Sequence, residues 1–244
     1  MKLHILYKVC DCVNSFNHCR RPLGLDKKAL IRACLPTVKK AMEPLDHYFS
    51  VIGDFVSAEI MDLVVSTLNP KNVYNAETHL GYINTMLKAS EFATETADDD
   101  IVFMLEEDYA VDYENFAPRL MDFLTHIQGM NLVLPWFIHP SDYQCQYNRL
   151  MARSYLLRTP LGYWREVSST TETWMCQAKT YKQRIDFFRE CNRNGDTDPR
   201  GSDGCISSIF KKEALCWSPL PGLTTHMAEG FICPFVDWRR LLGL

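Results

Sequence analysis

Short apolar runs alternate with longer amphipathic stretches through the first half of the chain. The longer stretches repeat their apolar residues at helical spacing, and one of them begins at Asp26, a suitable N-cap, and contains Pro36, a residue that kinks or splits helices. The pattern predicts strands at 3–9, 48–53, 73–74 and 101–105, and helices at 26–42, 58–68 and 81–94. Strands that alternate with helices predict an α/β fold with a mostly parallel sheet flanked by helices.

The second half of the chain is less regular. It predicts a strand at 132–137, a hairpin from 155–157 and 163–167, helices at 179–191 and 207–215, and a loop rich in Gly, Asp and Asn at 192–204. We find no internal repeat and no low-complexity linker. The expectation is therefore a single domain over residues 1–244, with a regular βα half and an irregular half.

The composition of the chain argues against several classes of function. The chain has 244 residues with 26 basic and 30 acidic side chains, a net charge of −4, which disfavours a nucleic-acid partner. No apolar run is long enough for a membrane span. The first residues resemble a strand more than an export signal, so we expect a cytoplasmic protein, in the host cytoplasm if its source is viral. The ten cysteines are then expected to be thiols.

One cluster of cysteines has an alternative interpretation. Cys10, Cys12 and Cys19 lie close together, with His18 beside them, and these are residue types that bind zinc. Their spacing does not match the paired cysteines of common zinc sites. Buried or loop thiols are therefore favoured over a zinc site.

The sharpest chemical feature follows the most apolar strand. Residues 101–105 lead directly into Glu106, Glu107 and Asp108. Ligands of open α/β sheets bind beyond the carboxyl ends of the strands, and three carboxylates there repel one another unless a hard cation such as Mg²⁺ or Mn²⁺ lies between them. The competing interpretation is a solvated acidic turn.

The distribution of charge strengthens the metal interpretation. Residues 98–108 hold six acids and no basic residue, so without them the net charge of −4 becomes +2. The acidic excess is local to one strand. Acids concentrated in this way favour a divalent cation bound among them.

A second strand also ends in an acid. Asp54 follows the predicted strand at 48–53, where a carboxylate can accept hydrogen bonds from a ribose or a base. Arg165 lies beside Trp164 and can bind phosphate oxygens in a bidentate manner. An ordinary loop acid and a core tryptophan are the alternatives for Asp54 and Trp164.

The ordered series of these motifs resembles the GT-A family of nucleotide-sugar glycosyltransferases, over residues 2 to 240. The resemblance rests first on Ile52-Gly-Asp54, the stretch 75–84 and the D-x-D-like Glu106-Glu-Asp108. In the second half it rests on residues 139–143, 163–165 with 168–171, and 219–226, and it is similar to a microbial and large-virus subgroup. The sequence departs from the pattern at Glu106, where the first acid is longer, and at Tyr163, where the subgroup suggests a histidine.

The resemblance implies a function and a site. Residues 1–110 would form the nucleotide-binding half and 111–244 the acceptor-binding half of a metal-dependent hexosyltransferase, of inverting type, that moves a sugar from a UDP-sugar to a glycan or glycoconjugate hydroxyl. The donor would contact Lys8, Val9, Cys10, Asp54, Gly81, Glu107 and Arg165. Mn²⁺ or Mg²⁺ would be held by Asp108 directly, with Glu106 assisting and His226 as a third ligand.

An inverting transferase also needs a general base for the acceptor hydroxyl, whereas a retaining enzyme, the stereochemical alternative, would not need this base. The resemblance favours Asp203, at a loop-to-helix boundary, while Glu172 and Asp198 are rivals and a simple helix cap is the structural alternative. Two other functions remain open. A sugar-nucleotidyltransferase shares the α/β sheet and the acids but usually has a Gly-rich phosphate loop, and an inactive glycan-binding module would keep the fold without the reaction.

Overall fold

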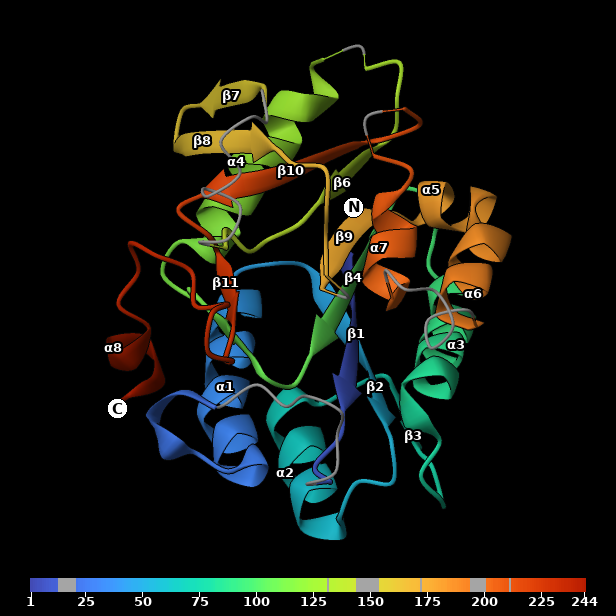
Figure 1. Ribbon diagram of the computed structural model, residues 1–244, viewed down its shortest axis with the longest axis vertical. Coiled ribbons are helices and arrows are strands. Elements are labelled where there is room, and N and C mark those ends of the chain that lie inside the picture. Colours follow the sequence, from blue (N-terminus) through green and yellow to red (C-terminus); the bar gives the residue numbers. More distant parts are fainter. Residues whose placement is uncertain (13–20, 131, 144–153, 172, 194–200, 211) are drawn as a thin grey trace.

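The computed structural model describes residues 1–12, 21–130, 132–143, 154–171, 173–193, 201–210 and 212–244. Its centre is a nine-stranded sheet in the order β3-β2-β1-β4-β9-β6-β10-β8-β7 (Figure 1). The strands of the sheet are β1 (Leu3–Val9), β2 (His47–Gly53), β3 (Asn72–Asn75), β4 (Ile101–Glu106), β6 (Trp136–Ile138), β7 (Leu156–Thr159), β8 (Gly162–Glu166), β9 (Trp174–Gln177) and β10 (Leu215–Leu220). The four strands β3, β2, β1 and β4 are mutually parallel, whereas β9, β8 and β7 pair antiparallel to their neighbours.

Helices cover both faces of this sheet. The helices are α1 (Lys27–Met42), α2 (Ala58–Leu68), α3 (Gly81–Thr94), α4 (Phe116–Gln128), α5 (Ala178–Gln183), α6 (Ile185–Arg193), α7 (Gly201–Ser207) and α8 (Trp238–Leu242), with a 3-10 turn at Pro22–Gly24. One core packs α1, α2 and α4 against Ile5 and Tyr7 of β1, and the other packs α3, α5, α6 and α7 against Leu6. Successive residues of β1 thus serve opposite faces, as the pleat of a strand requires.

The first half of the chain forms the predicted elements to within one residue at each end. Asp26 caps α1 by accepting a hydrogen bond from the amide of Ala29 at 2.7 Å. The helix continues through Pro36. Pro36 and Arg32 both lie on the exposed side of α1, so water can satisfy the carbonyl that loses its donor. The predicted parallel α/β core is therefore confirmed.

The rest of the chain departs from the prediction in several places. The predicted helix at 207–215 is wrong, because α7 ends at Ser207 and residues 215–220 form β10, whose central four residues are buried. The predicted helix at 179–191 is divided into α5 and α6 at Arg184. Strand β9, helices α4 and α8 and two short strands, Tyr109–Val111 and Thr224–His226, were not predicted, and the strand predicted at 132–137 lies at Trp136–Ile138. The hairpin of β7 and β8 is confirmed. The described ends of the predicted loop at 192–204, residues 192–193 and 201–204, are helical.

A small second sheet joins the two halves of the chain at the end of β4. Strand β5 (Tyr109–Val111) pairs antiparallel with β11 (Thr224–His226), and Tyr109 lies opposite His226 in this register. Met227 donates its amide hydrogen to the Asp108 carbonyl at 2.8 Å. The late histidine is thereby fixed beside the acids that follow β4.

The expectation that every cysteine is a thiol is wrong for one pair. Cys191 on α6 and Cys205 on α7 form a disulfide, because the two helices pack against each other on the same face of the sheet. Cys10, Cys12, Cys34, Cys176, Cys216 and Cys233 are free. Within the described ranges, no helix combines the length and the apolar character that crossing a membrane would require.

Candidate active site

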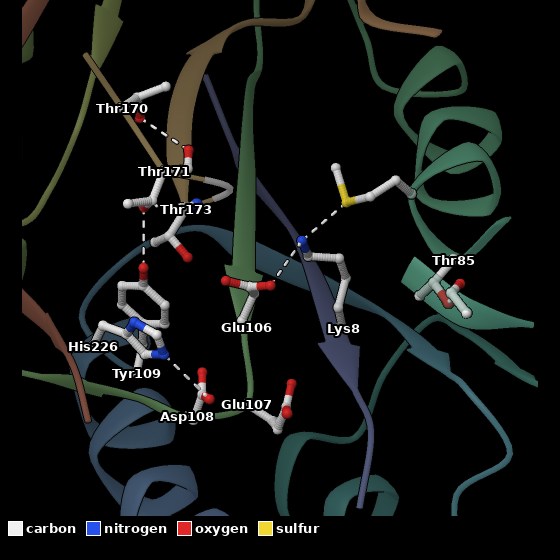
Figure 2. A network of polar contacts seen from close by, with 12 residues as sticks. Lys8, Thr85, Glu106, Glu107, Asp108, Tyr109, Thr170, Thr171, Thr173 and His226 are labelled. Atoms are coloured by element: carbon white, nitrogen blue, oxygen red, sulfur yellow. Dashed lines mark hydrogen bonds and ion pairs between the residues drawn. The ribbon is translucent and has the colours of Figure 1, made fainter. Parts of the chain in front are cut away.

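The three acids at the carboxyl end of β4 spread apart instead of forming one cluster. Lys8 lies opposite Glu106 in the register of β1 and β4, and its ammonium lies 3.4 Å from a Glu106 oxygen. Figure 2 shows Glu106 turned toward Lys8 and Asp108 turned toward His226. Glu106 is the most exposed of the three acids, and Glu107 and Asp108 are buried.

Asp108 is the most heavily contacted acid of the site. One of its carboxylate oxygens, Oδ2, lies 2.8 Å from Arg21 Nη1, 3.0 Å from Lys27 Nζ and 3.3 Å from His226 Nε2. Arg21 comes from the segment before α1, and Lys27 is the first residue of that helix. Three basic side chains from distant parts of the chain therefore meet on one carboxylate.

His226 is held in place by ring contacts as well as by charge. Its imidazole stacks on Tyr109 with ring centroids 5.0 Å apart and an interplanar angle of 5°. Burial alone would lower the pKa of His226, but the Asp108 carboxylate outweighs burial and raises it above its usual value. The shift favours the cationic form of His226 as long as the Asp108 carboxylate remains its partner.

The pKa values of the two buried acids, Glu107 and Asp108, shift in opposite directions. Burial, together with the neighbouring Asp108 and Glu106, raises the pKa of Glu107 to about 7 although Lys27 forms an ion pair with it. Burial also opposes ionisation of Asp108, yet Lys27, His226 and Arg21 hold its pKa well below the usual range. Asp108 is thus the permanently charged acid of the site.

Asp54 binds the turn that begins α3. Its carboxylate accepts the Leu80 amide hydrogen at 2.6 Å and lies 2.9 Å from His79 Nδ1. Gly81 follows at φ +76°, a left-handed conformation that favours glycine. Asp54 and Gly81 are therefore brought together, at the carboxyl end of β2, as parts of one turn.

The remaining donor-side residues lie at the end of β1. The Val9 carbonyl accepts the Asp54 amide hydrogen at 2.9 Å, which joins the ends of β1 and β2. The Cys10 and Cys12 sulfurs are 3.3 Å apart, and burial raises the pKa of the Cys10 thiol to about 12. His18 and Cys19, which the zinc alternative requires, lie outside the described residues.

Arg165 and Asp203 lie on elements of the second half of the chain. Arg165, on β8, forms an ion pair at 2.8 Å with Asp142, a fully buried acid, and neighbouring Trp164 is a core residue. Asp203 lies in the first turn of α7. The rival bases Glu172 and Asp198 lie outside the described residues.

A chain of hydrogen bonds connects α7 with the acid segment. Ser207 Oγ accepts the Thr170 amide hydrogen at 3.0 Å. The Thr170 hydroxyl donates to the Thr171 carbonyl at 3.0 Å, and Thr171 Oγ1 lies 3.0 Å from the Tyr109 hydroxyl (Figure 2). These hydrogen bonds link α7, the helix that carries Asp203, to Tyr109, the residue that follows Asp108 in the sequence.

Sequence reasoning named Lys8 and Arg165 but missed Arg21 and Lys27, the two basic residues that contact Asp108 beside His226. Arg21 and Lys27 are 87 and 81 residues from Asp108, and no local pattern predicts those contacts. It also missed Asp11, a buried acid whose carboxylate accepts the Ser57 amide hydrogen before α2. One general signal was available: a buried acid triplet requires countercharge, and the stretch after β1 contains Arg21 and Lys27.

The metal-binding side chains of the site suit a divalent cation only when a bound ligand supplies further oxygen atoms. Asp108 and His226 offer one carboxylate and one imidazole 3.3 Å apart, while Glu106 is turned toward Lys8. Within the described ranges, no group of three His, Cys, Asp or Glu side chains is arranged to hold a metal ion. Mg²⁺ is commonly bound by one or two carboxylates plus substrate phosphates, so two protein ligands fit such an ion when a diphosphate supplies the rest.

Comparison with known proteins adds evidence on the fold. No protein-family model matches the chain, and no curated protein matches its sequence. Among solved structures, S. aureus TarS is similar at 12% identity with a TM-score of 0.51, over 89% of this chain and 36% of TarS. The galactosyltransferase LgtC with donor and acceptor sugar analogues (15% identity, TM-score 0.47, 87% of this chain and 72% of LgtC) is also similar.

A glycosyltransferase involved in glycosylation of the major capsid of PBCV-1 has 9% identity and a TM-score of 0.47, over 99% of this chain and 97% of that protein. At these sequence identities the similarity is evidence for the fold alone. It rests on the TarS structure, which has the TM-score of 0.51. The chain spans about a third of TarS. The parallel core, the flanking helices and this likeness together give the chain the α/β fold of the GT-A glycosyltransferases.

Proposed function

We propose that the protein is a glycosyltransferase that moves a hexosyl group from a nucleoside diphosphate sugar, preferably a UDP-sugar, to a hydroxyl of a glycan or glycoconjugate. The observation that carries the proposal is the contact of Asp108, just beyond the carboxyl end of β4, with His226, while Lys8 and Glu106 pair at the neighbouring ends of β1 and β4. In open α/β sheets this edge is where ligands bind. The fold shared with TarS is consistent with it.

The nucleoside end of the donor lies at the ends of β1 and β2. Backbone atoms of residues 8–10 border it, and Asp54 with the turn at Gly81 forms its wall. The diphosphate lies between there and Asp108. Glu107 supports this region from beneath through its ion pair with Lys27, and Arg165 supports the acceptor side through Asp142.

Mn²⁺ or Mg²⁺ would be held by Asp108 and His226 together with diphosphate oxygens, and Glu106 would assist through water. Such an ion, when bound, stabilises the negative charge that develops on the leaving nucleotide. Binding and orientation of the substrates would depend on residues of the protein itself. They fix the donor at the sheet edge, hold His226 against Tyr109 and bring a base to the acceptor.

Asp203 is the general base of this proposal, in an inverting reaction. It would take the proton of the acceptor hydroxyl while that oxygen attacks the donor sugar. We expect Asp203→Asn to reduce sugar transfer by ~100-fold or more, because base catalysis contributes about that much, and to leave donor affinity within about twofold. Asp186→Asn, at an exposed acid of α6, is the matched control. Unchanged transfer in Asp203→Asn would move the role to Glu172 or Asp198.

Calorimetry tests the proposed donor class directly. We expect UDP to bind in the presence of Mn²⁺, and to bind more weakly without it. GDP and dTDP serve as comparison nucleotides. If none of the three binds with or without metal, the proposed function is wrong.

A further inference from the structure

Two basic side chains already contact Asp108, the carboxylate that the proposed function assigns to the metal ion. Arg21 Nη1 and Lys27 Nζ lie 2.8 and 3.0 Å from the same Asp108 oxygen. Their side chains are only 14% and 11% exposed, so these contacts are largely shielded from water. A largely buried ion pair is far less screened than a surface pair.

A divalent cation cannot simply join this arrangement. A metal ion bound to Asp108 Oδ2 would lie within a few ångströms of an ammonium and a guanidinium, and like charges at that separation in a poorly solvated site repel strongly. Metal binding therefore requires that Arg21 and Lys27 leave Asp108. Once displaced, they would be largely buried cations that need new anionic partners.

The diphosphate of a donor offers those partners. Arg21 can present several N–H donors to phosphate oxygens, and the Lys27 ammonium can serve as a point charge for them. Lys27 stays anchored meanwhile by its second ion pair, with Glu107. Both side chains can therefore exchange a carboxylate for a phosphate without leaving the site.

Resting on the proposed function, we infer that Arg21 and Lys27 form a cationic clamp that holds Asp108 in the free protein and transfers to the diphosphate of a nucleoside diphosphate ligand when the divalent cation binds Asp108. The clamp makes metal and nucleotide binding depend on each other. The free protein binds metal weakly, because the cation must displace the clamp. Nucleotide and metal together bind tightly, because the displaced clamp gains phosphate partners.

Opposite changes in two affinities distinguish the clamp from a purely structural role. In Arg21→Gln, Mn²⁺ affinity in the absence of nucleotide, measured by electron paramagnetic resonance of free Mn²⁺, should increase several-fold. UDP affinity in the presence of Mn²⁺, measured by calorimetry, should decrease about tenfold or more. A residue that only supported the fold would weaken both affinities when replaced.

Lys27→Met is a second variant for which we expect the same increase in Mn²⁺ affinity and the same decrease in UDP affinity. Arg32→Gln is the matched control, since it removes one positive charge from the exposed side of α1. The control should leave both affinities unchanged. Mn²⁺ that binds Arg21→Gln and Lys27→Met no more tightly than the wild type, or UDP affinity unchanged within twofold, overturns the clamp. Wild-type protein that binds no nucleotide would instead overturn the proposed function.

Discussion

Two buried histidines of this fold are held as neutral imidazoles. The His4 ring nitrogens lie 2.6 Å from Thr96 Oγ1 and 2.8 Å from Ser50 Oγ, and burial, reinforced by Lys71, lowers the pKa of His4 to about 4. Burial likewise lowers the pKa of His139 to about 4. In an unfolded chain both would have a pKa of about 6.5.

This difference predicts an acid-sensitive fold. Because the folded-state pKa is depressed, the stabilising contribution is complete above pH ~6.5 and is lost as pH falls toward 4. Each histidine accounts for roughly 3 kcal/mol of unfolding free energy across that range. Urea denaturation at several pH values should show the decline, and His4→Gln should flatten it. An identical pH slope in the wild type and His4→Gln would contradict the assignment.

At the scale of residues, the sequence indicated the acids of the site but not their partners. Glu106 to Asp108 follow an apolar strand, a local pattern that can be recognised without a structure. The contacts of Asp108 with Arg21 and His226 depend on how β1, β5 and β11 are arranged, and they span 87 and 118 residues. Only the folded chain determines such contacts.

At the scale of elements, the turn after β2 depends on the absence of a side chain. The Asn75 side chain accepts the Val56 amide hydrogen at 3.0 Å and donates to the Val56 carbonyl at 2.9 Å. A Cβ atom at Gly53 would lie 2.6 Å from that Asn75 oxygen and 2.5 Å from the end of Met61. Gly53 thus leaves room for the side chain that organises the turn after Asp54.

Gly53→Ala should therefore destabilise the protein by about 1–3 kcal/mol, since inserting a methyl group into a packed site forces its neighbours to move. Thermal denaturation measures this directly. Gly129→Ala is the matched control, because a Cβ there would meet its neighbours only at 3.4 Å or beyond, and it should change stability little. Equal melting temperatures for the wild type and Gly53→Ala would contradict the packing argument.

Local pattern determined the elements of the first half better than those of the second. Amphipathic helices such as α1 and the buried strand β4 carry their own periodicity. The run at 215–220 is apolar at a length that suits a strand or a buried helix, and it becomes β10 because it pairs with β6 and β8. Strand β9 is defined by its place between β4 and β6.

At the scale of the whole molecule, the local acidic excess is balanced by distant basic residues. Asp98 pairs with Lys182, Glu106 with Lys8, and Asp108 with Arg21 and Lys27. The charge count of the sequence suggested that a metal must neutralise the acids. In the folded chain its own basic side chains do so, and a metal has to compete with them.

Turnover of nucleoside diphosphate sugars tests the proposed transferase most directly. The purified protein is incubated with a panel of UDP-, GDP- and dTDP-sugars and Mn²⁺, and released nucleotide and sugar are identified by mass spectrometry. Asp108→Asn is compared with Glu114→Gln, which changes an exposed acid paired with Arg240. Circular dichroism confirms that both variants fold.

The account predicts that at least one donor is hydrolysed slowly to nucleoside diphosphate and free sugar, at a rate that falls ~100-fold or more in Asp108→Asn and stays unchanged in Glu114→Gln. Formation of pyrophosphate from a nucleoside triphosphate and a sugar phosphate would indicate a nucleotidyltransferase instead. Absence of hydrolysis for every donor, or equal hydrolysis by the wild type and Asp108→Asn, would contradict the account.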